Sequence, residues 1–209
     1  YTSKPTALFS NTQIENPNLM LEGMPNYRSG VDGLRVSNST KGGITFAAST
    51  TQNGIHMITV VLGVEAVDGD PYARFVATSS LMNYVVRTFV SSIVVKEGDP
   101  YGKSKASVMD GKSETVLAVA KKDFYIVEKQ GSQAEPKIQF KSTQESFKAP
   151  VKSGTTLGKL HYTDPDKIGR GYLEDQEPTV DMVAGRTIEK SFFLKVWWNE
   201  FVRYVNEKL

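Results

Sequence analysis

Residues Gly98–Ser104 read G-D-P-Y-G-K-S and resemble a nucleotide-phosphate loop more than any other segment does. They are one residue short of the G-x-x-x-x-G-K-S pattern, and no apolar strand and helix bracket them as phosphate chemistry requires. Glycine, aspartate and proline in succession are typical of a β-turn. We therefore predict a turn at this position. No dinucleotide-binding glycine loop and no G-x-S-x-G nucleophile motif occurs elsewhere.

The two histidines and the acidic clusters favour structural roles. His56 lies in an apolar run, and His161 lies near Asp164-Pro165-Asp166. Neither histidine has a second histidine at ligand spacing, which a zinc site would normally need. Asp164-Pro165-Asp166 is typical of an Asx-type turn. A solvated loop explains the short acidic run of Glu174, Asp175 and Glu177. We predict no metal site and no cofactor.

Composition narrows the possible classes further. The chain has 209 residues, a formal net charge of +2 and no cysteine. The small net charge does not indicate nucleic-acid binding, and the lack of cysteine excludes disulfides and thiolate metal sites. No apolar run reaches the length of about 18 residues that a transmembrane helix needs. The chain begins at Tyr1, from which we expect either processing or a designed fragment.

A three-stranded antiparallel meander is predicted over residues 31–63. Its strand-like runs are Val31–Ser37, Ile44–Thr51 and Ile55–Gly63. Asn53-Gly54 separates the last two runs, and Asn-Gly is the strongest short-range signal for a hairpin. The third run is almost continuously apolar, so we expect a strand covered on both faces. The preceding residues, 1–27, are polar and rich in turn formers, and predict a loop with short extended pieces.

A helix and a β-rich region should follow the meander. Asp70 before Pro71 predicts a helix N-cap, and apolar spacing predicts a helix from Pro71 to about Phe89 packed on the meander. From about Ser91–Ile93 onward, short apolar runs alternate with turns, which is typical of a sandwich-type domain. The candidate strands are Val116–Ala120, Phe124–Glu128, Lys137–Phe140, Gly158–Thr163 and Thr179–Val183.

The tail from Ile188 to Leu209 predicts an amphipathic helix. Its apolar residues follow i, i+3, i+4, i+7 spacing and include both tryptophans: Phe193, Leu194, Trp197, Trp198, Phe201, Val202, Val205 and Leu209. The largely opposite face carries Lys195, Asn199, Arg203, Asn206 and Lys208. Aromatic side chains beside cations are typical of a helix lying on a membrane surface. A helix docked on its own β domain remains the alternative interpretation.

Three segments of this sequence resemble the low-molecular-mass penicillin-binding proteins. They are N-P-N-L-M-L-E-G-M-P-N-Y-R-S-G-V-D-G-L, K-G-G-I-T-F-A-A-S-T and G-I-H-M-I-T-V-V-L-G. The family comprises serine D-alanyl-D-alanine carboxypeptidases, and the likeness is greatest to members from Gram-positive streptococci. The resemblance covers essentially the whole chain. It implies an extracytoplasmic protein at the outer face of the cell membrane that acts on peptidoglycan stem peptides.

The resemblance also implies an α+β organisation in three parts. Residues 1–91 would be the C-terminal part of the transpeptidase-like domain, with a partial antiparallel sheet and a helix. Residues 92–186 would be an all-β, sandwich-like domain, and residues 187–209 a membrane-associating helix. The family's transpeptidase-like sheet has five strands, of which three are expected here. The unpaired edge of Ile55–Gly63 would then be a pairing hazard, which predicts self-association or a companion N-terminal segment.

The family's catalytic motifs are S-x-x-K, S-x-N and K-T-G. No serine of this chain is followed by lysine three residues later, and no S-x-N occurs. At the position of K-T-G, after Val31-Asp32-Gly33-Leu34, stand Arg35, Val36 and Ser37. Arg35 keeps the charge as a planar fork, Val36 removes a hydroxyl donor, and Ser37 adds a side chain where glycine permits close approach. The resemblance therefore implies no catalytic residue in this chain.

Two functions fit these observations. The first is a carboxypeptidase-like cell-wall protein represented by its C-terminal portion, either as a fragment or as a degenerate paralogue, and inactive by itself. The second is a non-catalytic module that binds the membrane surface or acts as a spacer. Arg35 and Ser37 could also form a non-covalent site for a peptide carboxylate.

Overall fold

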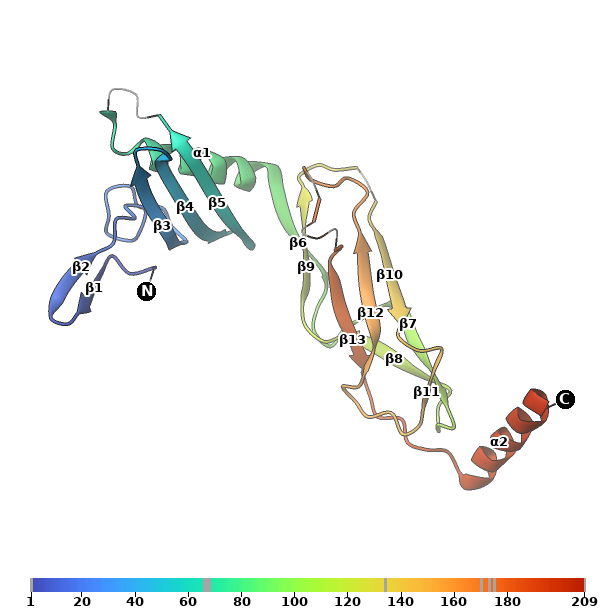
Figure 1. Cartoon of the computed structure of the whole chain (residues 1–209). Helices are drawn as coiled ribbons and strands as arrows, with labels where there is room; N and C mark the ends of the chain where they lie inside the picture. The colour runs from blue at the N-terminus through green and yellow to red at the C-terminus, as the bar shows by residue number, and fades with distance from the viewer. Residues whose placement is uncertain are drawn as a thin grey trace. The chain divides into compact units, whose positions relative to one another are not determined.

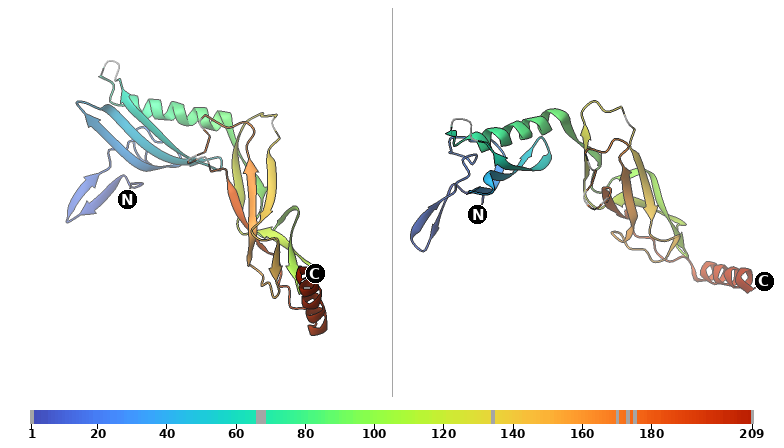
Figure 2. Two further views of the ribbon diagram at one scale, coloured as in Figure 1. Left: turned by 45° about the vertical axis from the view of Figure 1, so that its right-hand side comes forward. Right: turned by 45° about the horizontal axis from the view of Figure 1, so that its top comes forward.

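A computed structural model describes residues 2–65, 69–133, 135–169, 171–172, 174 and 176–208. Strands predominate in this part of the chain, and two helices accompany them (Figures 1 and 2). The chain divides into two compact units. The first comprises Tyr1–Ser91 with Val127–Gly131, and the second comprises Ser92–Ile126 with Ser132–Leu209.

The first unit begins with a two-stranded hairpin. Strands β1 (Thr6–Phe9) and β2 (Thr12–Glu15) pair antiparallel. The turn between them places Ser10 and Asn11 at φ of 45° and 66°. Asparagine tolerates this left-handed region because its short polar side chain can bond locally. The segment expected to be a loop with short extended pieces thus contains a defined hairpin.

The meander is confirmed. Strands β3 (Val31–Ser39), β4 (Gly43–Gln52) and β5 (Ile55–Val64) form an antiparallel sheet in that order. Asn53 and Gly54 have φ of 51° and 75°, as the tight turn between β4 and β5 requires.

The expectation that β5 is covered on both faces is wrong for the described residues. Ile55, Met57 and Val61 are buried on one face, whereas the alternate side chains Ile58, Val60 and Leu62 are 62%, 55% and 75% exposed. Successive side chains of a strand point to opposite faces. Only the face toward α1 is packed, so the other face of β5 exposes apolar side chains to solvent.

Helix α1 (Ala73–Thr88) packs on β4 and β5. Phe75 and Met82 meet Phe46 and Met20 in the core, and the rings of Phe46 and Phe75 form an edge-to-face pair with centroids 5.1 Å apart. The predicted cap is wrong: the helix begins at Ala73, and Tyr72 occupies the N-cap position. The Asp70 carboxylate instead accepts a hydrogen bond from the Tyr72 backbone N–H, 2.9 Å away. This Asx-type bond holds Pro71 and Tyr72 in a turn before the helix.

The second unit is built on a six-stranded sheet with the order β10-β12-β13-β8-β7-β11. Its strands are β7 (Pro100–Met109), β8 (Thr115–Ala120), β10 (Lys137–Ser142), β11 (Ser146–Lys148), β12 (Thr156–Thr163) and β13 (Thr179–Ala184). β11 pairs parallel to β7, and the other described pairs are antiparallel. The pair β6 (Phe89–Val95) and β9 (Phe124–Lys129) forms a separate ribbon. All five candidate strands are confirmed, and β6, β7 and β11 were missed.

Alternate residues of these strands form the core of the second unit. Buried side chains include Val116, Leu157, Leu160, Tyr162 and Met182. The phosphate-loop look-alike contains the predicted turn, in which the Asp99 N–H donates to the Lys96 carbonyl over 3.1 Å. Pro100 to Ser104 then open β7, so a strand and not a helix follows the turn.

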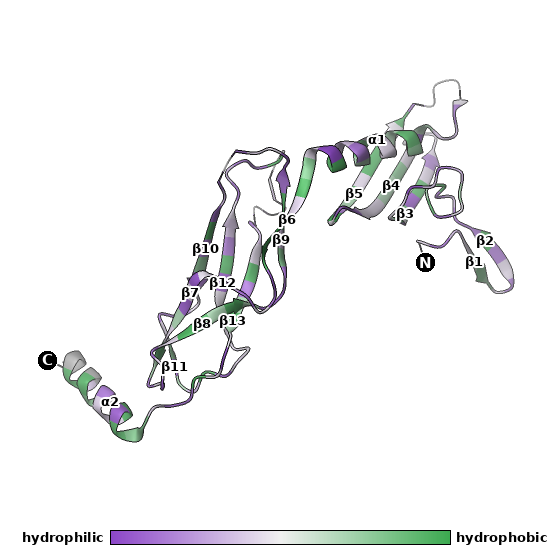
Figure 3. Ribbon diagram, turned by 180° about the vertical axis from the view of Figure 1, so that it is seen from behind, coloured by the Kyte–Doolittle hydropathy of each residue, from purple (hydrophilic) through white to green (hydrophobic). Residues whose placement is uncertain are grey.

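Helix α2 (Phe193–Lys208) confirms the helical tail from Phe193 on, whereas Ile188 forms a β-bridge with Val151 before the helix begins. Two polar contacts join it to the β7–β8 connection: Asn199 Nδ2 to Asp110 Oδ1 at 3.4 Å, and Lys195 Nζ to Glu114 Oε1 at 3.7 Å. Apolar and polar segments alternate along α2 (Figure 3). Leu209 and the side chains of Arg203, Asn206 and Lys208 lie outside the described residues. Neither described helix has the length and apolar character needed to cross a membrane.

Candidate functional site: a cleft beside strand β3

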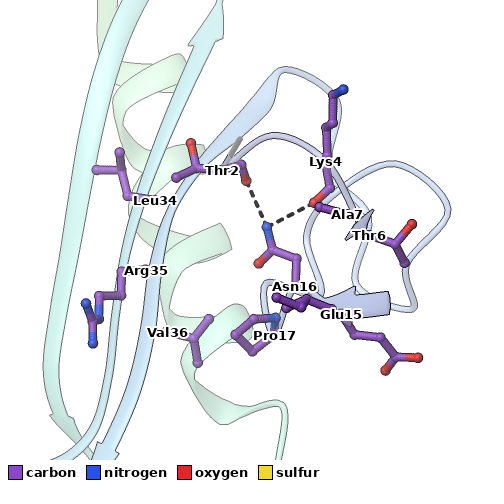
Figure 4. A pocket seen from close by; sticks show the side chains of 11 residues that line it. Thr2, Lys4, Thr6, Ala7, Glu15, Asn16, Pro17, Leu34, Arg35 and Val36 are labelled. Atoms are coloured by element: carbon purple, nitrogen blue, oxygen red, sulfur yellow. Dashed lines mark hydrogen bonds between the residues drawn. The ribbon is translucent and has the colours of Figure 1, made fainter. Parts of the chain in front are cut away.

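A cleft of about 570 Å³ lies between β3 and the N-terminal hairpin segment. Leu34, Arg35 and Val36 line it from β3, and Lys4 and Glu15 line it from the hairpin segment (Figure 4). Asn16 braces the hairpin side, because its amide donates to the carbonyls of Thr2 and Lys4 at 3.0 and 3.1 Å. The cleft thus has one wall on a sheet and one wall on a short hairpin.

The structure separates the three residues at the K-T-G position. Arg35 and Val36 line the cleft, and Ser37 does not. Arg35 is exposed, whereas Val36 is half-buried against the core of the first unit. The Ser37 carbonyl accepts hydrogen bonds from Arg74 Nη1 and from Thr45 Oγ1, both at 3.2 Å. Ser37 therefore takes part in holding the strand, at the end of the segment away from the cleft lining.

Arg74 ties helix α1 to the two strands behind the cleft. Its side chain is only 5% exposed, and it donates to the carbonyls of Ser37 and Thr45 and to Asn38 Oδ1. Burial lowers the pKa of Arg74 from its usual value, because the charged form loses hydration. A charged donor to backbone carbonyls is among the stronger hydrogen bonds in a protein. Arg74 thereby fixes β3, whose neighbouring residues line the cleft.

Sequence reasoning missed Arg74. The available signal was its spacing, because Arg74 precedes Thr78 and Met82 at intervals of four on the buried side of α1. An arginine on an apolar helix face needs acceptors in the interior, and this position pointed to the strands beneath. Arg28, half-buried in the loop before β3, also joins distant segments: it donates to Asn83 Oδ1 at 2.9 Å and to Gln52 Oε1 at 3.0 Å.

The cleft is chemically suited to an anionic group with an apolar neighbour. Two cations, Lys4 and Arg35, and one carboxylate, Glu15, lie among its lining residues. Leu34 and Val36 supply the apolar surface beside Arg35. Within the described residues, no group of three or more histidine, cysteine or acidic side chains could hold a metal ion.

The other residues considered from the sequence lie away from this cleft. His56 is exposed on β5, and His161 is half-buried on β12. The Asx turn is confirmed, since the Asp166 N–H donates to Asp164 Oδ1 at 2.8 Å. Asp175 of the acidic run lies outside the described residues.

Comparison with known proteins decides the relationship. Residues 89–190 match the family model "Penicillin-binding protein 5, C-terminal domain". A crystal structure of a peptidoglycan synthesis regulatory factor (PBP3) from Streptococcus pneumoniae is 44% identical, with a TM-score of 0.84. It aligns with 90% of this chain and 51% of its own. These matches confirm the resemblance of this chain to the penicillin-binding proteins.

The chain is also similar to more distant penicillin-binding proteins. D-alanyl-D-alanine carboxypeptidase DacA of Haemophilus influenzae is 27% identical over 63% of this chain and 32% of its own length. DacC of Escherichia coli is 25% identical over 80% of this chain and 38% of its own length. Penicillin binding protein 5 from Haemophilus influenzae shares the fold, with a TM-score of 0.60, 21% identity and coverage of 90% of this chain and 50% of its own. The chain spans about a third of the curated relatives and half of the solved structures.

Proposed function

We propose that this chain is part of a D-alanyl-D-alanine carboxypeptidase-like protein of the cell wall. The match of residues 89–190 to the penicillin-binding family carries this proposal. Under it, the sheet β3-β4-β5 with α1 is the C-terminal part of the transpeptidase-like domain, and β3 is the strand that borders the substrate cleft. The substrate is the peptidoglycan stem peptide, and the reaction removes a terminal D-alanine through an acyl-enzyme.

Under this proposal, the 209-residue chain does not perform the reaction by itself. The sequence contains neither S-x-x-K nor S-x-N, which supply the serine nucleophile and its activating partners. Val36 stands where the family's threonine would donate a hydroxyl, so that hydrogen bond to substrate is lost.

Fluorescent penicillin labelling tests whether the chain lacks a serine nucleophile. The isolated chain should take up no covalent label, because labelling needs a serine nucleophile. The protein isolated from its own cells should be measured for intact mass and label in parallel. A larger labelled species would support a carboxypeptidase with this chain as one portion, whereas label on the 209-residue chain would contradict the proposed inactivity.

The cleft beside β3 can still hold a peptide carboxylate without covalent chemistry. Arg35 offers a planar fork of donors, and Lys4 is a second cation among the lining residues. A peptide ending in D-Ala-D-Ala should perturb the NMR signals of cleft residues, and Arg35→Gln should abolish the perturbation. Arg87→Gln, an exposed change on α1, is the matched control. Equal shifts in wild type and Arg35→Gln would refute a carboxylate site at Arg35.

A second candidate function is a membrane-surface or spacer module, carried by α2. Phe193, Trp197 and Trp198 are 67%, 61% and 58% exposed, and Leu194, Phe201 and Val202 are also exposed. Val205 is half-buried. Asn199 and Lys195 make polar contacts with the β7–β8 connection, and the apolar side chains named above, apart from Val205, are exposed to solvent. An exposed aromatic stripe matches the interfacial region of a bilayer. Under this second candidate function, we propose that α2 holds the protein at the outer face of a Gram-positive cell membrane.

Liposome co-sedimentation tests whether α2 binds a membrane surface. We expect wild type to sediment with anionic vesicles and Trp197→Ser/Trp198→Ser to remain largely in solution. The control Leu8→Ser/Phe9→Ser removes two apolar side chains of even greater exposure from the hairpin β1–β2 and should sediment like wild type. Equal sedimentation of the tryptophan variant would exclude α2 as the anchor.

A further inference from the structure

A second hollow, of about 460 Å³, lies on the solvent-facing side of the six-stranded sheet in the second unit. Three lysines surround it although they come from separate parts of the chain. Lys121 and Lys122 follow β8, and Lys159 lies on β12. The complete lining is Lys121, Lys122, Lys159, Thr179, Val180 and Asp181.

Strand pairing extends this cluster across the sheet. Lys141 on β10 is directly opposite Lys159, and Lys159 is directly opposite Asp181 on β13. The Lys121 N–H donates to the Asp181 carbonyl at 3.0 Å, which brings Lys121 into the same row. Lys121, Lys122, Lys141 and Lys159 are referred to here as the lysine face. Like charges directly opposite one another destabilise a sheet, so the repulsion between Lys141 and Lys159 lowers the stability of the β10–β12 pair.

Carboxylates compensate only part of this charge. Asp181 pairs with Lys121, whose Nζ lies 3.6 Å from Asp181 Oδ2. Glu177 lies near His161 but is bound to Lys167 Nζ at 3.7 Å and to Thr163 Oγ1 at 2.9 Å. In the described parts of the chain, Lys122, Lys141 and Lys159 have no carboxylate within 4.0 Å.

His161 lies beside the lysine face, two residues after Lys159 on β12. Its pKa is lowered from the usual 6.5, first by burial and then by the charges of Lys141 and Lys159, with Glu177 acting in the opposite direction. A neighbouring titratable group thus experiences an excess of cationic charge on this face.

We propose that the lysine face binds phosphate groups of an anionic polymer or of a lipid headgroup. Lysine ammonium groups act as point charges toward phosphate, and the Thr179 hydroxyl adds a neutral donor beside them. A phosphate group offers several acceptor oxygens and a negative charge, which suits several neighbouring ammonium groups better than one carboxylate does. This binding site is separate from the β3 cleft and does not depend on carboxypeptidase chemistry.

The test uses the full 209-residue chain with two double variants of equal charge change. Lys122→Gln/Lys159→Gln removes two members of the lysine face. Lys103→Gln/Lys148→Gln removes two exposed lysines from β7 and β11 of the same sheet. Inorganic polyphosphate is the soluble probe, titrated by calorimetry at low and high salt. Phosphatidylglycerol vesicles, compared with phosphatidylcholine vesicles, provide the lipid arm.

We expect saturable polyphosphate binding that weakens with salt, and a roughly five- to tenfold loss of affinity in the lysine-face variant. The control variant should change affinity less than about twofold. If phosphatidylglycerol binding also falls in the lysine-face variant, the headgroup is a source of the phosphate. If it is unchanged, the source is a soluble polymer. Absence of saturable binding, or equal losses in both variants, would overturn the proposal.

Discussion

Arg74 is the residue whose loss should cost the first unit most. It is buried and donates to acceptors on β3 and β4. Arg74→Ala leaves the Ser37 and Thr45 carbonyls without this donor, which should lower the free energy of unfolding by about 2–3 kcal/mol. Arg74→Lys should lower the free energy of unfolding by less than Arg74→Ala does. An ammonium group keeps the charge but lacks the forked guanidinium geometry that reaches acceptors on both strands.

Urea unfolding followed by far-UV circular dichroism measures the effect of the Arg74 variants. Both tryptophans lie on α2, so tryptophan fluorescence would not report on the first unit. The exposed Arg87→Ala on the same helix should stay within about 0.5 kcal/mol of wild type. An Arg74→Ala protein as stable as Arg87→Ala would show that water replaces the buried guanidinium without cost.

His161 should titrate below its usual pKa of 6.5. Because the unfolded chain then binds more protons between the two pKa values, the His161 contribution to stability is present above pH 6.5 and is lost as the pH falls through the folded pKa. Lys141→Gln and Lys159→Gln should each raise the pKa of His161 by removing a positive charge, and burial should keep it below 6.5. NMR titration of the imidazole protons in a His56→Gln background isolates the signal. A folded pKa of His161 above the usual value, or one that neither lysine variant changes, would contradict the expected effect of the two lysine charges.

At the scale of elements, the β10–β12 pair contains an avoidable repulsion. Lys141→Glu places opposite charges across from Lys159 and should raise the free energy of unfolding by about 0.2–1 kcal/mol. Lys137→Glu is the matched control, since Lys137 faces Thr163 on the same strand pair. Urea midpoints at low and high salt measure both variants, and the gain should shrink as salt screens the charges. A gain equal in both variants would assign it to net charge.

Element prediction succeeded where alternation or turn chemistry was explicit. The β4–β5 hairpin follows from Asn53-Gly54, which accepts the positive φ of a tight turn. β7 was missed because Pro100, Gly102 and a run of small polar residues are typical of a turn. Its inward residues Ser104, Ala106 and Val108 do alternate, but they are small, and pairing with β8 and β11 makes the segment a strand. Tertiary context here overrides local propensity.

At the scale of the molecule, β5 is an open edge within the described part of the chain. It pairs with β4 on one side, and the alternate apolar residues Ile58, Val60 and Leu62 are exposed. We expect concentration-dependent self-association in sedimentation velocity, because such an edge can pair with a second copy. Val60→Lys should shift the chain toward monomer, whereas Val76→Lys, an equally exposed site on α1, should not. A monomeric wild type at all concentrations would contradict self-association.

The candidate site could be predicted only in part. The position of Arg35, Val36 and Ser37 follows from the resemblance to the penicillin-binding family, but their different surroundings do not. Arg35 and Val36 meet the hairpin segment across a cleft, and Ser37 is bound behind it by Arg74. These contacts join residues separated by tens of positions in the chain, and no local pattern encodes them.

Local patterns in the sequence sufficed to predict the meander, the α1 and α2 segments, five strands of the second unit and the resemblance to the penicillin-binding proteins. Three features depend on the folded chain: which face of β5 is packed, where Arg74 finds its acceptors, and the proximity of Lys121, Lys141 and Lys159 on one sheet. Periodicity shows that a strand has two faces, because side chains alternate. What covers each face, and which charges lie opposite one another, depends on pairing between distant segments.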